Sequence, residues 1–319
     1  MMSRRAAMVW FLGLWMLALP VQGFGAAWIL SPQEYDFEVF SQYFWNTADF
    51  NASGHRVRKP NDGRFEEFRE EVKVEAGLPL PCSTLPPFLH RVNVLFSLPV
   101  EIAHYEDRNV DLQTIGVEEI RLGVKYCLTC KTACEAAPRP NVTPRSSILA
   151  GPLAVSGQLT GEFPACNKRA QPPLADCQLD GEVRLLVSQG FFPEPGDRGR
   201  ARLYASVEVG YRFRAEEPAD EIPYVVEIGW YPWNSEQTRV LLKGMLDGVE
   251  SRAFGGRGAE EDFVKWTLSG RFELGRLVLS QNPTRPRKTS GIEIGGGTVF
   301  AGKNTGAGQS IFVKLFYNY

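Results

Sequence analysis

The residues that most often carry enzyme chemistry are scarce in this chain. Its 319 residues include three histidines, His55, His90 and His104. A hydrolase built into a membrane barrel would need a histidine beside a serine or an aspartate, because proton transfer requires such a partner. Only His55, in a polar stretch that also contains Asp62, offers that pairing. We therefore expect no catalytic residue and no enzymatic activity.

Six cysteines are the second group that could do chemistry. Cys166 and Cys177 lie in one polar stretch, and we favour a disulfide between them. Closing a loop of about ten residues would stabilise the fold by about 2–3 kcal/mol in the chain-entropy account. The other four cysteines follow or precede two neighbouring strand-like segments, and two disulfides among them are expected in an exported chain. These four are Cys82, Cys127, Cys130 and Cys134.

The same cysteines give weaker support to metal or haem chemistry. The spacing C-x-x-C at 127–130 lacks the βαβ context of a thioredoxin-like site. Covalent haem attachment would need a histidine at position 131, which is a lysine. A four-cysteine zinc site is disfavoured in an oxidising compartment. We expect no metal and no cofactor.

Charged residues alternate with apolar ones over long segments of the chain. In RLYASVEVGYRFR, residues 202–214, the charged side chains share one side and the apolar ones share the other. This period of two is that of a β-strand. The charged residues on the polar sides of the clearest segments are our candidates for lining a lumen. They are Glu67, Arg69, Glu71, Lys73, Arg202, Glu208, Arg212, Arg214, Lys243, Asp247, Arg271 and Lys314.

The alternating segments are numerous and long. They number about twelve and begin near residues 34, 65, 88, 116, 146, 181, 200, 222, 238, 262, 290 and 309. Several exceed the typical soluble strand of about 5–6 residues. A tilted strand needs about 9–11 residues to cross a bilayer, so these segments are long enough to do so.

Alternation alone does not separate a soluble sandwich from a membrane barrel, because it does not say which face is inside. The strand lengths, their even number and the aromatic clusters favour the barrel. Such clusters occur at 43–45, 230–233 and 316–319, and are typical of the girdles at the two membrane interfaces. A barrel also leaves no strand edge unpaired. We predict an all-β, antiparallel transmembrane β-barrel of about twelve strands.

The first residues indicate export. Arg4 and Arg5 precede an apolar run from Ala6 to Leu19 and then small residues, which is the layout of a secretory signal peptide. Cleavage is expected after Gly25 or Ala27. We therefore divide the chain into a signal peptide, 1–27, and one barrel domain, 28–319. The net charge of −2 does not fit a nucleic-acid-binding protein.

Three glycines at 295–297 do not open a predicted helix, so they do not form a phosphate loop. Glycine inside a strand typically marks a bend or a close approach of another chain segment. We expect one of these two roles for Gly295, Gly296 and Gly297.

Several strings resemble a known family. They are GYRFRAEEPADEIPYVVEIGWYP, FAGKNTGAG, the closing aromatic strand and the early stretch EYDFEVFSQYFWNTADFNASGHRVRKPNDGRFEEF. They are similar to bacterial outer-membrane β-barrel transporters related to the barrels found with meta-pathway phenol-degradation clusters. The resemblance implies a gated or narrow pore for small molecules in a Gram-negative outer membrane. It also implies that the barrel-assembly machinery reads the terminal aromatic residue, Tyr319. The cysteine-containing stretch YCLTCKTACEAAPRP departs from the family pattern.

Two functions follow for such a barrel. The charged residues can line a polar passage for a small-molecule solute, as in an outer-membrane channel. Alternatively, they can form salt-bridge networks that fill the barrel, which would then serve as a structural or assembly component with partner-binding loops. Eight-stranded barrels are filled and 16-stranded porins are open, so twelve strands do not decide between them. We favour the channel, with the lipid bilayer as its environment and without strong ion selectivity.

Overall fold

The structure is a computed structural model. It describes residues 27–30, 32–78, 83–130, 153–165, 171–172, 178–193, 201–215, 219–235, 237–252, 261–275 and 289–318. The predicted signal peptide up to residue 26, the terminal Tyr319 and four of the six cysteines lie outside these ranges. Among the described residues, no helix is long and apolar enough to cross a membrane.

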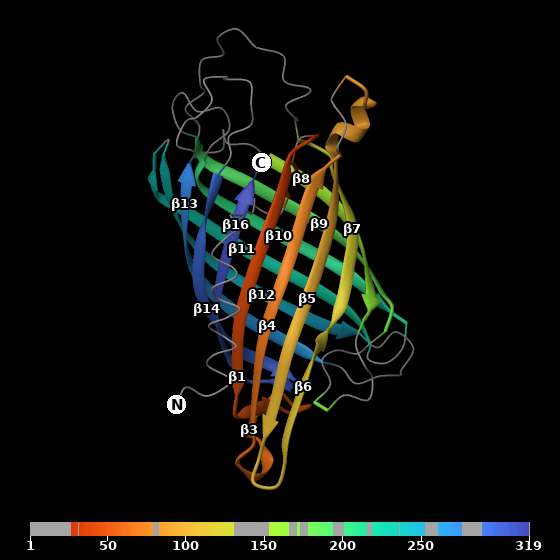
Figure 1. Ribbon diagram of the computed structural model, residues 1–319, viewed down its shortest axis with the longest axis vertical. Helices are drawn as coiled ribbons and strands as arrows, with labels where there is room; N and C mark the ends of the chain where they lie inside the picture. Colours follow the sequence, from red (N-terminus) through yellow and green to blue (C-terminus); the bar gives the residue numbers. More distant parts are fainter. Residues whose placement is uncertain are drawn as a thin grey trace.

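The strands form one closed antiparallel barrel (Figure 1). Around the wall the order is β4-β1-β16-β14-β13-β12-β11-β10-β9-β8-β7-β5, and a direct pairing of β4 with β5 completes the circle. The short β6 continues the position of β7 along β5, so the wall has twelve strand positions. The C-terminal strand β16 pairs with β1 over ten residue pairs, which removes the open edge. The prediction of a twelve-stranded transmembrane barrel is confirmed.

The strand boundaries follow the alternating segments. The long wall strands are β1 (Tyr35–Asn46), β4 (Arg64–Gly77), β5 (Val92–Glu106), β7 (Glu119–Cys127), β8 (Leu153–Pro164), β9 (Asp180–Pro193), β10 (Ala201–Arg214), β11 (Asp220–Asn234), β12 (Thr238–Arg252), β13 (Asp262–Gly275), β14 (Thr289–Lys303) and β16 (Gln309–Asn318). The shorter strands are β2 (Ala48–Phe50), β3 (Arg56–Arg58), β6 (Asp111–Val117) and β15 (Thr305–Gly306). Two 3₁₀ turns, η2 (Pro60–Asp62) and η3 (Pro87–Arg91), lie at opposite ends of β4 and β5.

The apolar side of the strands faces outward. Leu268 on β13 and Ile294 on β14 are both 57% exposed, whereas Glu293, one residue along, is 1% exposed. In a water-soluble sandwich the apolar side would be buried and the charged side exposed. Outward apolar and inward polar side chains match a barrel in lipid, whose backbone groups are all paired within the wall.

The aromatic clusters divide between the two faces. Trp230 and Trp233 are outward and more than half exposed, as a membrane girdle requires. Phe316 is fully buried, because its position in the alternation turns it into the barrel. The girdle prediction was therefore wrong for the inward members of each cluster. Consecutive aromatic residues on a strand cannot share a face.

A bulge interrupts the wall between β6 and β7. Strand β5 pairs with β6 over residues 100–106 and with β7 over residues 92–97, with Glu118 between the two. The break shifts the alternation, so that the consecutive Glu118 and Glu119 are both buried. The bulge also accounts for the difference between the strand start predicted near residue 116 and the observed start. The regular alternation of the following segment begins only after the bulge, whereas the strand begins at Asp111.

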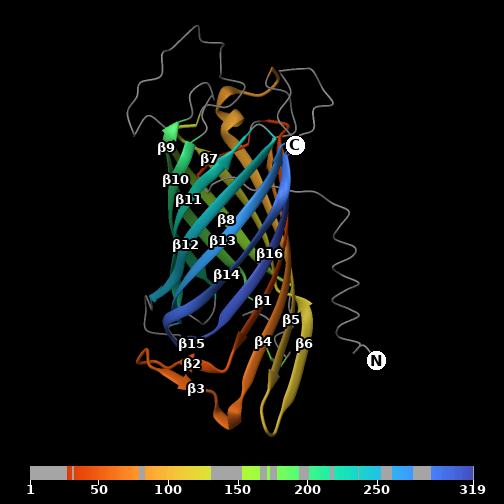
Figure 2. The same ribbon diagram turned by 90° about the vertical axis from the view of Figure 1, so that its left-hand side faces the viewer.

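The end of the barrel opposite the C-terminus carries a second, smaller sheet (Figure 2). It consists of β15, β2 and β3, and it is joined to the barrel through the connections after β1 and β14. Ala48, Phe50 and Ala307 form its small apolar cluster and pack against Val299 of β14. The sheet therefore covers one side of this barrel mouth.

Candidate functional site

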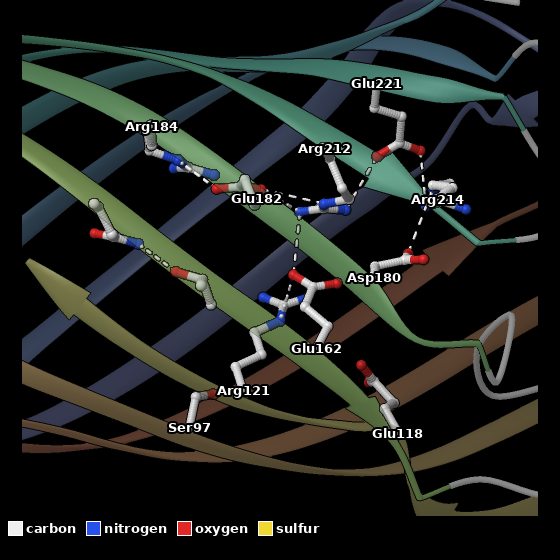
Figure 3. Close-up of polar contacts among 12 residues, drawn as sticks. Ser97, Glu118, Arg121, Glu162, Asp180, Glu182, Arg184, Arg212, Arg214 and Glu221 are labelled. Carbon is white, nitrogen blue, oxygen red and sulfur yellow. Dashed lines mark hydrogen bonds and ion pairs between the residues drawn. The ribbon is translucent and has the colours of Figure 1, made fainter.

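The barrel interior is charged, and one part of its wall is filled by ion pairs (Figure 3). Arg212 on β10 contacts three carboxylates, with its guanidinium nitrogens 2.9 Å from Glu182, 3.0 Å from Glu221 and 3.4 Å from Glu162. Glu162 lies on β8, two strands away, so this contact passes over the inner surface of β9. Such a contact is available only inside the barrel.

The network extends on both sides of Arg212. Arg184 on β9 is 2.7 Å from Glu182 and 2.8 Å from Glu208. Arg214 lies 2.8 Å from Glu221, and Arg121 on β7 lies 3.1 Å from Glu162. We call this set on β7 to β11 the ion-pair arc. Its members are Arg121, Arg184, Arg212, Arg214, Glu162, Glu182, Glu208 and Glu221.

The opposite part of the wall is filled mainly by aromatic rings. Phe312 and Phe316 on β16 lie over Gly295 and Gly291 of β14, and a Cβ atom at either glycine would overlap the ring and a backbone oxygen of β13. Phe44 on β1 covers Gly308 in the same way. Of the two roles expected for these glycines, a bend or a close approach, Gly295 has the close approach, here of the Phe312 ring. We call these three rings and their glycines the aromatic arc.

A smaller set of ion pairs accompanies the aromatic arc. Lys243 on β12 lies 2.8 Å from Glu293 on β14, and Lys314 lies 3.3 Å from Glu38. The guanidinium of Arg271 stacks 3.6 Å from the centre of the Phe316 ring and 3.1 Å from Glu273. A stacked and paired guanidinium of this kind is held in one orientation.

The described part of the barrel interior includes a larger and a smaller cavity. The larger, about 540 Å³, is at the mouth covered by the small sheet, and we call it the vestibule. It is lined by residues of β1, β4 and β12 to β14, including Glu67 and Arg69. The smaller, about 250 Å³, lies nearer the other end, and we call it the upper chamber. Its lining includes Glu38, Glu71 and Lys73.

The two cavities meet at a pair of neighbouring inward residues on β4. Arg69 lines the vestibule and Glu71 lines the upper chamber, and their side chains approach to 3.8 Å. Arg69 also reaches Glu118 at the bulge, at 3.2 Å. Glu71 is held by Lys73 at 3.2 Å and accepts a 2.5 Å hydrogen bond from Ser97. These groups form a polar boundary between the cavities.

The segment before β1 crosses the other mouth of the barrel. The carbonyl of Ala27 accepts a 2.5 Å hydrogen bond from Ser156 of β8, and its amide donates to Ser188 of β9 at 3.2 Å. Ser188 in turn shares a 2.7 Å hydrogen bond with Ser206 of β10. Because these strands lie across the barrel from β1, the chain must pass through the lumen to reach them. Ala27 itself is completely buried.

A disulfide lies beside this crossing. Cys127 at the end of β7 is bonded to Cys130, and Cys127 packs with Ala27, Ala154 and Leu186 in an apolar cluster. The pairing is one of those open to the group of four cysteines. Cys82, Cys134, Cys166 and Cys177 lie outside the described residues, so the favoured Cys166–Cys177 bond stays a prediction.

The structure brings most of the candidate lumen residues together in the interior. Glu208, Arg212 and Arg214 belong to the ion-pair arc. Arg69, Glu71 and Lys73 form the boundary, and Lys243, Arg271 and Lys314 accompany the aromatic arc. Glu67 and Asp247 line the vestibule. Arg202 differs, because it lies exposed near the start of β10.

Sequence reasoning missed several partners of these residues. They are Glu38, Arg121, Glu162, Glu182, Arg184, Glu227, Glu273 and Glu293. The alternation that identified Arg212 also holds for Glu182 and Arg184, which are interleaved with Val183 and Leu185. Glu293 is harder to find, since glycines follow it in place of an alternating polar face. Glu118 could not be found by alternation at all, because the bulge reverses the register there.

The histidines are placed outside this interior site. His104 lies between Glu66 and Asp111, with its Nε2 atom 2.7 Å from the Asp111 carboxylate. Asp62, the partner considered for His55, forms its ion pair with Arg108. Within the described ranges, no three histidine, cysteine, aspartate or glutamate side chains are arranged to hold a metal ion.

Comparison with known proteins identifies the fold. No protein-family model matches the chain, and no curated protein sequence matches it. Among solved structures, the chain is similar to an outer membrane channel from Pseudomonas putida F1. The TM-score is 0.58 at 9% identity, covering 93% of this chain and 98% of the channel. At this identity the likeness concerns the fold, which is that of Gram-negative outer-membrane barrels.

A second match is the translocator domain of the autotransporter NalP from Neisseria meningitidis. It has a TM-score of 0.38 and 10% identity, and covers 99% of this chain and 96% of that domain.

Proposed function

We propose that the protein is an outer-membrane channel that passes small polar solutes through its lumen. The observation that carries the proposal is the pair of interior cavities whose linings meet at Arg69 and Glu71. The structural match to an outer membrane channel of the same length supports it. No covalent chemistry is required, so the interior residues act by lining and gating the passage.

The boundary at Arg69 and Glu71 would be the narrowest part of the passage. A solute leaving the vestibule meets Arg69, whose charge is shared between Glu71 and Glu118. The contact of Arg69 with Glu71 is the longer of the two, so a rotation that released Glu71 and kept Glu118 would join the cavities without leaving the guanidinium unpaired. Solutes larger than such an opening would be excluded.

A filled barrel with a structural or assembly role is the second candidate. The dense contacts of the ion-pair arc and the crossing of Ala27 favour it, since both occupy space that a solute would need. In that case the loops at the vestibule end would be the surfaces that meet a partner.

The proposal also covers export and assembly. It includes removal of the signal peptide, residence in a Gram-negative outer membrane, and recognition of Tyr319 by the barrel-assembly machinery. Mass spectrometry of the purified protein would test the first point. Cleavage after Gly25 keeps Ala27 and its contacts with Ser156 and Ser188, whereas cleavage after Ala27 removes them.

Single-channel recording of the purified protein in a planar bilayer tests the two candidates. The channel predicts small, steady openings, which should grow several-fold on Arg69→Ser because the boundary loses its largest side chain. Lys303→Ser is the matched control, since Lys303 is exposed and pairs with Asp262 at the barrel rim. It should leave the conductance unchanged.

Silent bilayers would overturn the channel proposal if the protein is shown to be folded by its resistance to heat unfolding on a gel. An Arg69→Ser variant that is folded and equally silent would favour the filled barrel. Recording should be repeated with reductant, since openings that appear only then would assign the gate to a disulfide.

A further inference from the structure

The vestibule has the size of a ligand site. Its volume of about 540 Å³ falls within the usual range of about 300–1,000 Å³ for sites of small molecules. Its lining combines three apolar rings with six charged groups, so it is more polar than a typical small-molecule site. The rings are Phe44, Phe65 and Phe263, contributed by β1, β4 and β13.

Three charged groups of the vestibule are not committed to ion pairs. Among the described residues, Lys265, Glu67 and Asp247 have no oppositely charged atom within 4.0 Å, unlike their neighbours Lys59 and Arg69. Lys265 is nevertheless directly opposite Asp247 in the pairing of β13 with β12, and Glu67 lines the same cavity. The vestibule therefore presents one available cation between two available anions.

The arrangement contrasts with the other charged positions of the lumen. Lys243, Arg212 and Lys314 each have a carboxylate within 3.3 Å. These three groups are half-buried, and a charge without a close partner inside a membrane barrel is often functional. A ligand with groups of opposite charge would supply the missing partners and would therefore bind favourably.

We infer that the vestibule binds a small zwitterion with an apolar side chain, such as an apolar α-amino acid. Its carboxylate would pair with Lys265, its ammonium with Glu67 or Asp247, and its side chain would pack against the three phenylalanine rings. The phenylalanine faces also favour the ammonium group, because an aromatic ring attracts a cation to its face.

A ligand with a single charge fits less well. An anion would satisfy Lys265 but add to the repulsion of two carboxylates, and a cation would oppose Lys265. The six charged groups of the whole lining sum to zero, and only a ligand carrying both signs keeps that balance. The inference rests on the proposed function for its role in passage, but binding itself does not require an open channel.

Calorimetric titration of the purified, detergent-solubilised full chain tests the inference. The probes are L-phenylalanine, 3-phenylpropanoate, which lacks the amine, and 2-phenylethylamine, which lacks the carboxylate. L-Phenylalanine should bind at least tenfold more tightly than either analogue. Equal or tighter binding of one analogue would overturn the zwitterion assignment.

Variants assign the two ends of the ligand. Lys265→Met should weaken L-phenylalanine at least tenfold and should not weaken 2-phenylethylamine, whereas Glu67→Gln should leave 3-phenylpropanoate unweakened. Lys303→Met, at the same end but outside the vestibule, is the control. Weakening by the control as large as that by Lys265→Met would also overturn the inference.

Two further variants distinguish a specific loss of binding from a failure of Lys265→Met to fold. Lys265→Arg keeps the charge and should retain binding, and Phe263→Ala removes one ring and should weaken all three probes. Because titration is done without a bilayer, its outcome is independent of conductance. Binding without conductance would contradict the channel proposal alone, and conductance without binding would contradict this inference alone.

Discussion

The ion-pair arc and the aromatic arc fill the same barrel by different means. In the ion-pair arc, three arginines on β9 and β10 are surrounded by carboxylates of their own and neighbouring strands. In the aromatic arc, Phe312 and Phe316 lie over glycines of the adjacent strand. The charges of the ion-pair arc are in ion pairs. The aromatic arc borders the vestibule through Phe44, and there Lys265, Glu67 and Asp247 have no oppositely charged atom within 4.0 Å among the described residues.

The difference shows where the lumen can respond to a solute. A guanidinium that bonds three carboxylates is fixed, since moving it would leave buried charges uncompensated. An ammonium such as that of Lys265, which has carboxylates near but not in contact, can move toward a ligand at little cost. In the proposed channel, the contacts that stabilise the barrel and those that would bind a solute therefore lie in different parts of the wall.

Removing an arginine from the ion-pair arc should give the largest loss of stability. Arg212→Met leaves Glu162, Glu182 and Glu221 without their shared partner, and the expected cost is about 3–5 kcal/mol. Lys265→Met in the vestibule should cost less than about 1 kcal/mol, as for a charge without a close pair. Urea unfolding in lipid vesicles measures both.

The two variants have the same side chain in place of a cation, so they form a matched pair. Comparable losses in the two would show that the vestibule charges are as firmly held as those of the ion-pair arc. That result would contradict the proposed difference in charge pairing between the ion-pair arc and the vestibule.

Adding one methyl group tests the aromatic arc. Gly295→Ala would place a Cβ atom against the Phe312 ring and the Leu268 carbonyl, and should cost about 1–3 kcal/mol as an overpacked site. Gly181→Ala on β9 is the control, because a Cβ atom there meets nothing within 4 Å. Equal stability of the two variants in the same unfolding assay would contradict the close approach of ring and glycine.

Substitution of a residue that holds the N-terminal segment should destabilise the barrel less than the changes described above. Ser188→Ala removes one hydrogen bond to Ala27 and one to Ser206, and each is worth about 0.5–1.5 kcal/mol. We expect this loss to increase proteolysis of the segment before β1 without unfolding the barrel. Limited proteolysis followed by mass spectrometry measures it, with Ser269→Ala as the comparison on a distant strand. A barrel that unfolds with the segment would show that the two are one cooperative unit.

The smallest effect is expected outside both arcs, in the turn between β5 and β6. The backbone amides of Asn109 and Val110 donate to the Asp107 carboxylate and lower its pKa. A carboxyl with a lowered pKa stabilises the turn above its ordinary pKa, and this contribution is lost as the pH falls through the lowered value. Hydrogen exchange of the two amides should therefore accelerate on acidification in the wild type. In Asp107→Asn it should be independent of pH once the intrinsic rate is removed, and a persistent dependence would contradict this origin.

The period of two determined a large part of this protein from sequence. It located the wall strands and placed Arg212, Arg214 and Lys314 on the inner face, because side-chain direction along a strand is a local property. It failed where one residue shifts the register, as at Glu118, and where glycine hides the pattern, as around Glu293.

Tertiary structure alone determined which charged residues pair, where the cavities lie and how the N-terminal segment runs. The contact of Arg212 with Glu162 crosses a strand between them, and Glu67 shares the vestibule with Lys265 and Asp247 although β4 does not pair with β12 or β13. No spacing along the chain encodes these distances, since they arise only when strands far apart in sequence pair in one register. The sequence by itself determined which residues share the charged face of each strand, and the closed barrel decided that this face lines the lumen and which of its residues are paired.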